Sequence, residues 1–302
     1  MTEPGRVRTL QHAVLGPGGV GGLVAAALAH QGQDVTVVVR PEVLDTYPAW
    51  LSLDRPDGSC RVSIKRTAAV TRRFDVLWIA VKAAQLDGAL SVVRGDGELG
   101  AVVPLLNGID HVGTLRERFG HDRVVPATIA VESERIRPGV IVQRSPFVRL
   151  NVSSLGHERL AQTLDTLGQF GFTCRFSEDE TTLLWSKLVF LAPLALATTA
   201  AGMAIGDVIG QAPWRARFEQ CVLEVCAVAV GCHAKVDAAQ ILAAFQALPP
   251  GMRSSMQKDV AAGKAPELDA IAGPILRRAE DFGIDIPATQ ELVAIVRAGA
   301  TA

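Results

Sequence analysis

The chain has 302 residues, of which 49% are hydrophobic and 20% are charged, and its formal net charge at pH 7 is -1. These values are typical of a globular protein with a substantial core, and the length fits two domains or one large one. Acidic and basic residues are interspersed without a basic stripe, which argues against a nucleic-acid partner.

The chain opens with a strand, a glycine-rich turn and a helix. A β-branched run at 12–16 predicts the strand, and an alanine-rich stretch at 20–32 predicts the helix. Between them lies Gly16-x-Gly18-x-x-Gly21, in which the first glycine permits a tight turn and the second lets backbone approach a pyrophosphate. The third glycine lets the helix pack closely on the strand, and the helix N-terminus offers N–H groups to phosphates.

We therefore predict that this turn binds a dinucleotide, with an ordinary glycine turn as the alternative. The predicted cofactor-binding residues of the turn are Gly16, Pro17, Gly18, Gly19, Val20 and Gly21. A second strand follows at 34–40 and ends at Arg40. An NAD enzyme places Asp or Glu there for the ribose 2′-hydroxyl, whereas a guanidinium suits a 2′-phosphate. Arg40 therefore predicts NADP(H), unless it is a solvated surface residue.

The remaining first half continues the alternation of strands and helices. Apolar runs at 74–82 and 101–108 flank a helix-compatible segment, and residues 123–144 predict two more strands joined by a turn at 137–139. Buried strands linked by helices are typical of parallel β-α-β units.

After about Ser177 the pattern becomes helical, which predicts a domain of residues 1–177 followed by an all-α domain of residues 178–302. The expected helices lie at 177–200, 212–232, 238–248 and 272–283. An uncharged run from Leu188 to Gly206 follows Lys187 and is barely long enough to span a bilayer. Because the run contains Pro193 and is rich in alanine, we predict a buried core helix and no membrane partner.

The cysteines indicate a reducing compartment. They are odd in number and form no C-x-x-C pair: Cys60, Cys174, Cys221, Cys226 and Cys232. The N-terminal stretch lacks the apolar region of a signal peptide. We therefore expect a cytoplasmic protein, and we expect no metal site.

Several motifs together resemble those of the ketopantoate reductase (2-dehydropantoate 2-reductase) family. They occur in the family's order across nearly the whole chain: "GPGGVGG" (16–22), "VKAAQ" (81–85), "LLNGID" (105–110), "WSKL" (185–188), "RSSMQKDVAAGKAPELD" (253–269) and "GPILRRAEDFGIDIP" (273–287). The resemblance implies an α/β Rossmann-type N-terminal domain and an all-α C-terminal domain like that of 6-phosphogluconate dehydrogenase. It also implies reduction of 2-dehydropantoate to pantoate with NADPH, a step of pantothenate biosynthesis.

By position, the resemblance implies roles for five side chains. Lys187 matches the catalytic lysine, and Glu267 matches a glutamate that lies near this lysine and the cofactor ribose. Asn107 and Lys82 match residues at the nicotinamide end of the cofactor, and we expect Asn107 to contact the substrate as well. Ser255 matches a substrate-contacting serine.

The chemistry of ketone reduction suits a lysine at this place. Hydride transfer to a ketone carbon builds negative charge on the oxygen, which an ammonium can stabilise and protonate. Partial burial lowers the pKa of a lysine and makes it a better acid. Each residue also has a structural alternative: a snorkelling lysine for Lys187, a solvated helix-start glutamate for Glu267, a turn for Asn107, a surface lysine for Lys82 and a helix cap for Ser255.

The resemblance further implies asparagines that grip the substrate, one of them a helical turn after the lysine. This chain has Leu191 and Ala195 at the two successive turns and Met252 three residues before Ser255. Its only asparagines are Asn107 and Asn151, so no other alignment restores the set. We therefore predict that Leu191 and Ala195 contact the substrate and that the pocket wall around Leu191, Ala195 and Met252 is more apolar than is usual in the family.

The leading hypothesis is an NADPH-dependent reductase of a small-molecule 2-oxo acid, with 2-dehydropantoate as the first substrate to test. One alternative is a reductase of the same family that acts on a more apolar 2-oxo acid or ketone. Others are a non-catalytic NADPH-sensing protein and a β-hydroxyacid dehydrogenase of similar plan. The alanine-rich stretch 222–231 is compatible with packing inside the chain or across the two-fold axis of a homodimer.

Overall fold

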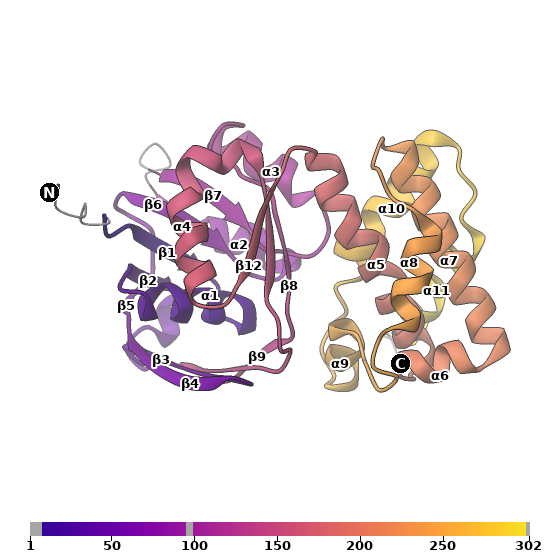
Figure 1. The fold of residues 1–302 in the computed structure, drawn as a ribbon, viewed down its shortest axis with the longest axis horizontal. Helices are drawn as coiled ribbons and strands as arrows, with labels where there is room; N and C mark the ends of the chain where they lie inside the picture. Colours follow the sequence, from indigo (N-terminus) through magenta and orange to yellow (C-terminus); the bar gives the residue numbers. More distant parts are fainter. Residues whose placement is uncertain (1–7, 95–98, 300–302) are drawn as a thin grey trace, which may run out of the picture. The chain divides into compact units, whose positions relative to one another are not determined.

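The computed structural model describes residues 8–94 and 99–299, so part of the N-terminal stretch that lacks a signal-peptide pattern lies outside the described residues. The chain divides into two compact units, which Figure 1 shows in the colours of the sequence. The first unit runs to Leu106 and continues from His111 to Glu178. The second unit contains Asn107–Asp110 and continues from Asp179. The first unit carries the sheets and the second is built from helices, which confirms the predicted fold class.

A five-stranded parallel sheet in the order β5-β2-β1-β6-β7 forms the centre of the first unit. Its strands are β1 (Gln11–Leu15), β2 (Asp34–Val38), β5 (Lys65–Thr67), β6 (Phe74–Ile79) and β7 (Leu99–Pro104). All but β5 are strands that the sequence predicts. The chain leaves β1 toward β2 and later returns to β6 on the other side of β1. Parallel sheets bind ligands beyond the carboxyl ends of the strands at such a switch point.

Two smaller sheets complete the first unit, in the orders β4-β3-β10-β9 and β12-β11-β8. Their strands are β3 (Trp50–Arg55), β4 (Gly58–Ser63), β8 (Ala127–Ala130), β9 (Ser133–Arg137), β10 (Val140–Gln143), β11 (Arg149–Ser153) and β12 (Thr173–Ser177). Residues 123–144 thus contain three strands instead of the predicted two, although the turn between β9 and β10 lies where we expected it. The extra strand, β8, pairs with β11 in a different sheet, which local pattern does not reveal.

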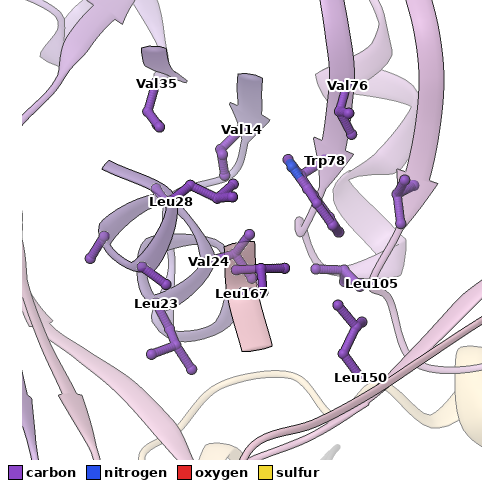
Figure 2. Close-up of a cluster of buried hydrophobic side chains, with 14 of the residues drawn as sticks. Val14, Leu23, Val24, Leu28, Val35, Val76, Trp78, Leu105, Leu150 and Leu167 are labelled. Carbon is purple, nitrogen blue, oxygen red and sulfur yellow. The ribbon is translucent and has the colours of Figure 1, made fainter. Parts of the chain in front are cut away.

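Helix α1 (Gly19–His30) is apolar on all sides because it is covered on all sides. It contacts β1 and β2 of the parallel sheet and also all four strands of the β4-β3-β10-β9 sheet. Figure 2 shows its side chains among those of the strands and of α4 (His157–Gln169): Val14, Leu23, Val24, Leu28, Val35, Val76, Trp78, Leu105, Leu150 and Leu167. Full burial of one such aliphatic side chain contributes about 1.5–3 kcal/mol to folding. The cluster therefore fixes the strand-turn-helix segment that carries the glycines.

The second unit is a bundle of helices around α5. Its helices are α5 (Glu180–Ala201), α6 (Ile205–Gly210), α7 (Ala212–Gly231), α8 (Ala238–Gln246), α9 (Ser255–Ala261), α10 (Leu268–Phe282) and α11 (Pro287–Gly299). Two further helices, α2 (Leu86–Leu90) and α3 (His111–Phe119), belong to the first unit. All four predicted helices are present. Helix α5 is long and apolar enough to cross a membrane, but 61% of its most apolar window is buried within the structure. It packs against α7, α9 and α11, as a core helix does.

A buried carboxylate joins two of these helices. Glu224 on α7 accepts hydrogen bonds from the backbone N–H groups of Ala288 (3.1 Å) and Thr289 (2.8 Å) at the start of α11. It also accepts the Thr289 hydroxyl at 2.7 Å. The first N–H groups of a helix lack acceptors within the helix, and a negative charge is favoured there. Glu224 therefore caps α11 from a neighbouring helix.

Replacing Glu224 with alanine is expected to lower the free energy of unfolding by about 2–4 kcal/mol, because two buried donors of Thr289 and one partly buried donor of Ala288 lose their acceptor. Urea denaturation measures this loss. The matched control is Glu219→Ala, at an exposed position of the same helix, for which we expect a change within about 0.5 kcal/mol. Equal losses for the two variants would show that the cap contributes nothing.

Candidate active site

The glycine turn after β1 has the geometry that its sequence predicts. Gly16 has φ +89°, a left-handed conformation that other residues adopt only with strain. A side chain at Gly21 would clash with the carbonyl oxygen of Gly16, so the helix and the turn are in close contact there. By contrast, a Cβ atom at Gly18 would meet nothing within 4 Å, which leaves open space in front of the turn.

The start of α1 fits the pyrophosphate of a dinucleotide. Gly18 is the N-cap and its N–H donates to Gly16 O at 2.8 Å, and the first turn of the helix contains no acidic residue. N–H groups of a first helical turn have no acceptor in the helix, and the helix dipole favours an anion. Pro17 is buried and Val20 is half-buried. A phosphate group at this turn would meet N–H donors, and the first turn of α1 presents no carboxylate to repel it.

Gly19, a predicted cofactor-binding residue, is also required for packing. A side chain there would clash with the Ser133 carbonyl of β9, and the Ser133 hydroxyl donates to Gly19 O at 2.9 Å. A side chain at Gly22 would clash with Ile141 of β10. The glycine fingerprint alone does not account for these two positions, because the strands that they contact, β9 and β10, lie more than a hundred positions away in the sequence.

Arg40 and Lys82 follow the two strands that flank β1. The parallel register pairs Leu15 with Val38 of β2 and with Ile79 of β6. Arg40, two residues after β2, is exposed, and Lys82, three residues after β6, is half-buried before a short 3-10 helix, η2 (Ala83–Gln85). The glycine turn and both cations therefore lie at the same edge of the sheet.

Three predicted site residues come together in the second unit. The Asn107 side chain donates from Nδ2 to Glu267 Oε2 at 3.3 Å, across 160 positions of sequence. Lys187 lies half-buried on α5, and burial lowers the pKa of its ammonium to about 8, while the Glu267 carboxylate acts to raise the pKa. Glu267 directly precedes α10, which packs against α5. The group combines a cation of near-neutral pKa with a carboxylate and an amide.

Ser255 is the first residue of α9 and is exposed. The helix cap is its neighbour Ser254, a buried residue whose Oγ accepts from the Gln257 N–H at 3.1 Å. Ser254 also shares a 2.9 Å hydrogen bond with Thr198, whose hydroxyl donates to Leu194 O at 2.7 Å. The cap alternative therefore applies to Ser254 and leaves Ser255 accessible; a run of two serines does not reveal in advance which one caps.

The face of α5 that continues from Lys187 is apolar. Leu191 and Ala195 follow at intervals of four residues, which places them on the same face of the helix. Ala195 is buried in the apolar core of the second unit. Leu191 and Met252 are half-buried and pack against this core. Two threonines follow: Thr198 is already engaged with Ser254 and Leu194, and the buried Thr199 Oγ1 atom has no hydrogen-bond partner among the described residues. The residues beyond Lys187 thus offer a ligand mainly apolar contacts.

Sequence comparison gives two matches to family models. Residues 12–156 match the model described as "Ketopantoate reductase PanE/ApbA", and residues 180–300 match "Ketopantoate reductase PanE/ApbA C terminal". The 2-dehydropantoate 2-reductase of Caulobacter vibrioides is 31% identical over 301 residues, which cover 95% of this chain and 98% of the relative.

Comparison with solved structures finds the same two-part fold. A PanE/ApbA family ketopantoate reductase from Ralstonia eutropha has a TM-score of 0.84 and 24% identity and covers 96% of this chain and 98% of its own. A D-mandelate dehydrogenase solved with NADH and anilino(oxo)acetate has a TM-score of 0.84, 18% identity and the same coverage. A ketopantoate reductase from Staphylococcus aureus, described as dimeric, has a TM-score of 0.78 and 21% identity, with 97% and 99% coverage.

Proposed function

Because the chain belongs to the ketopantoate reductase family of oxidoreductases, we propose that it reduces 2-dehydropantoate to pantoate with NADPH, as a step of pantothenate biosynthesis. The observation that carries this proposal is the half-buried ammonium of Lys187, which interacts with the Glu267 carboxylate and whose pKa of about 8 suits proton donation near neutral pH. The carboxylate and amide of Glu267 and Asn107, joined by a hydrogen bond, belong to the same group.

In this proposal the first unit holds the cofactor. The glycine turn would bind the pyrophosphate, and Arg40 would bind the 2′-phosphate through its planar guanidinium. Lys82, at the same edge of the sheet, would contact the nicotinamide end. A bound reduced nicotinamide supplies the hydride.

Lys187 would act on the ketone oxygen. Its ammonium stabilises the negative charge that develops there and then donates a proton from Nζ. The Glu267 carboxylate keeps the amine in its charged form, because it acts to raise the pKa that burial lowers. Asn107 donates to Glu267 and retains its amide oxygen as an acceptor.

This role predicts a definite pH dependence. The Lys187 amine loses its proton as the pH rises through about 8, so kcat/KM should be constant below this value and fall roughly tenfold per pH unit above it. A lysine of ordinary pKa would sustain the rate to about pH 10. The measurement is kcat/KM for reduction between about pH 6 and about pH 10. A Lys187→Arg variant should be slower and lack this fall, since a guanidinium does not titrate in that range.

A reductase of a more apolar 2-oxo acid is the second candidate, and the apolar side chains of Leu191, Ala195 and Met252 favour it. The test compares 2-dehydropantoate with 3,3-dimethyl-2-oxobutanoate, which differs only in lacking the hydroxyl group. A site built to bind that hydroxyl should prefer 2-dehydropantoate by roughly 10⁴-fold or more in kcat/KM. An apolar pocket should instead favour the compound without the hydroxyl, by up to roughly 10²-fold.

The remaining expectations about partners and location are also proposals. A homodimer is supported by the dimeric Staphylococcus aureus neighbour, and sedimentation velocity tests it directly. The five cysteines are all free, which supports a reducing cytoplasmic location.

A further inference from the structure

The segment Asn107–Asp110 belongs to the second unit, although the residues before and after it belong to the first. Successive residues of the segment are attached to that unit in different ways. Asn107 donates to Glu267, and Ile109 packs against the apolar core of the helices. Asp110 accepts a hydrogen bond from Arg277 of α10. The segment is therefore attached at both ends: Asn107 bonds to Glu267, the residue before α10, and Asp110 bonds to Arg277 of α10.

Gly108 brings the backbone of the segment against α10. It has φ +81°, and a side chain there would clash with the Ala270 carbonyl oxygen. The conformation and the close approach both require glycine. The main chain between Asn107 and Asp110 is thus held on the helix surface, so a change at Asp110 is transmitted to Asn107 over a short path.

Arg277 has its own support on α10. Its guanidinium bridges Asp110 and Asp269, with a distance of 3.4 Å from Nη1 to Asp269 Oδ1. To reach Asp269 the side chain lies along the helix over Gly273, where a Cβ atom would be 2.7 Å from Nη2 and 2.8 Å from the Asp269 carboxylate. Glycine inside a helix costs about 1 kcal/mol relative to alanine. At position 273, however, the absence of a side chain leaves space for the Arg277 guanidinium to bridge Asp269 and Asp110.

We propose that Arg277 is a positioning residue of the active site, which acts through Asp110 to hold Asn107 against Glu267. The inference rests on the proposed function, in which Glu267 sets the charge state of Lys187. Arg277 touches none of the reacting groups. Its guanidinium holds Asp110 at one end of the segment. Asn107 lies at the other end, and its side-chain amide orients the Glu267 carboxylate.

The matched control is the neighbouring arginine. Arg278 is as exposed as Arg277, with side-chain exposures of 52% and 53%, but it pairs with Asp281 on its own helix at 3.0 Å. Arg277→Gln and Arg278→Gln therefore remove the same charge at similarly exposed positions. Arg277→Gln breaks the pairs with Asp110 and Asp269, Arg278→Gln breaks only the pair with Asp281, and only the first releases the segment. Thermal unfolding of both variants checks that the fold is kept.

The first readout is backbone hydrogen exchange of the peptide that covers residues 105–112, measured on the full chain without ligands. Arg277→Gln and Asp110→Asn should each speed exchange in this peptide by about fivefold, as expected for an exposed pair, and Arg278→Gln should leave it unchanged. Unchanged exchange in Arg277→Gln, or an equal effect of Arg278→Gln, would overturn the proposal.

The second readout is kinetic. Arg277→Gln should lower kcat by about fivefold and leave the KM for NADPH unchanged, and the double variant Asp110→Asn/Arg277→Gln should be no slower than either single variant. Additive losses would show that Arg277 does not act through Asp110 and would overturn the proposal. If the unmodified protein reduces no 2-oxo acid, the proposed function has failed, and the exchange readout alone then decides whether Arg277 holds the segment.

Discussion

Replacing Lys187 with alanine is expected to lower kcat for ketone reduction by roughly 10²–10⁴-fold while the cofactor still binds. The ammonium is the proposed source of both the proton and the positive charge beside the developing oxyanion, so its removal takes away both contributions. Cofactor binding should persist, because the glycine turn and Arg40 belong to the first unit and Lys187 to the second. The measurements are steady-state kcat with NADPH and the cofactor dissociation constant by fluorescence titration.

The control for this variant is Lys264→Ala, which removes an exposed lysine of the same unit, with a side-chain exposure of 66%. It should retain full activity. The comparison also separates an enzyme from an NADPH-sensing protein, since a sensor has no turnover for the substitution to remove. A Lys187→Ala variant that reduces its substrate at the original rate would rule out Lys187 as the proton donor.

Replacing Arg40 with aspartate is expected to weaken NADPH binding by roughly 10²–10³-fold and to leave NADH binding nearly unchanged or improved. A charge-assisted hydrogen bond to phosphate contributes about 1.5–3 kcal/mol, and a carboxylate near a 2′-phosphate adds repulsion. A carboxylate at this position can instead accept the ribose 2′-hydroxyl of NADH. Titration of the variant with both cofactors measures the two dissociation constants.

The matched control for Arg40→Asp is Arg73→Asp. Arg73 is also exposed but precedes β6, so it lies at the amino ends of the parallel strands, opposite the glycine turn. It should leave the ratio of the two dissociation constants unchanged. Equal losses of NADPH and NADH affinity in Arg40→Asp would show that its guanidinium does not contact the phosphate.

The parts of the fold that the sequence predicts are those with a strong local signal. The strands β1 and β2 and the turn between β1 and α1 combine β-branched runs with glycines at fixed spacing, so they need no information from distant residues. The sequence does not predict the half-exposed strands β3 and β4, because each is only six residues long and carries a weak apolar pattern. Their partner β10 follows much later in the chain.

The candidate site likewise contains one residue with a strong local signal in the sequence and several features that depend on contacts between distant residues. Lys187 stands out locally because it directly precedes an uncharged run, and the structure places it half-buried on α5, where burial lowers its pKa. The hydrogen bond between Asn107 and Glu267 joins residues 160 positions apart, and no periodicity indicates it. Gly19 must be glycine because a side chain there would clash with β9, and Ser254 is the helix cap; both features also depend on tertiary contacts. The packing of the folded chain decides these features.

The most direct test of Lys187 as the proton donor is a crystal structure of the protein with NADP and a 2-hydroxy acid product. We expect the Lys187 Nζ atom within about 2.7–3.2 Å of the oxygen on C2 of the product, the distance of a hydrogen bond. A product whose C2 oxygen is hydrogen-bonded to another group, while the Lys187 amine faces solvent, would contradict this role of Lys187.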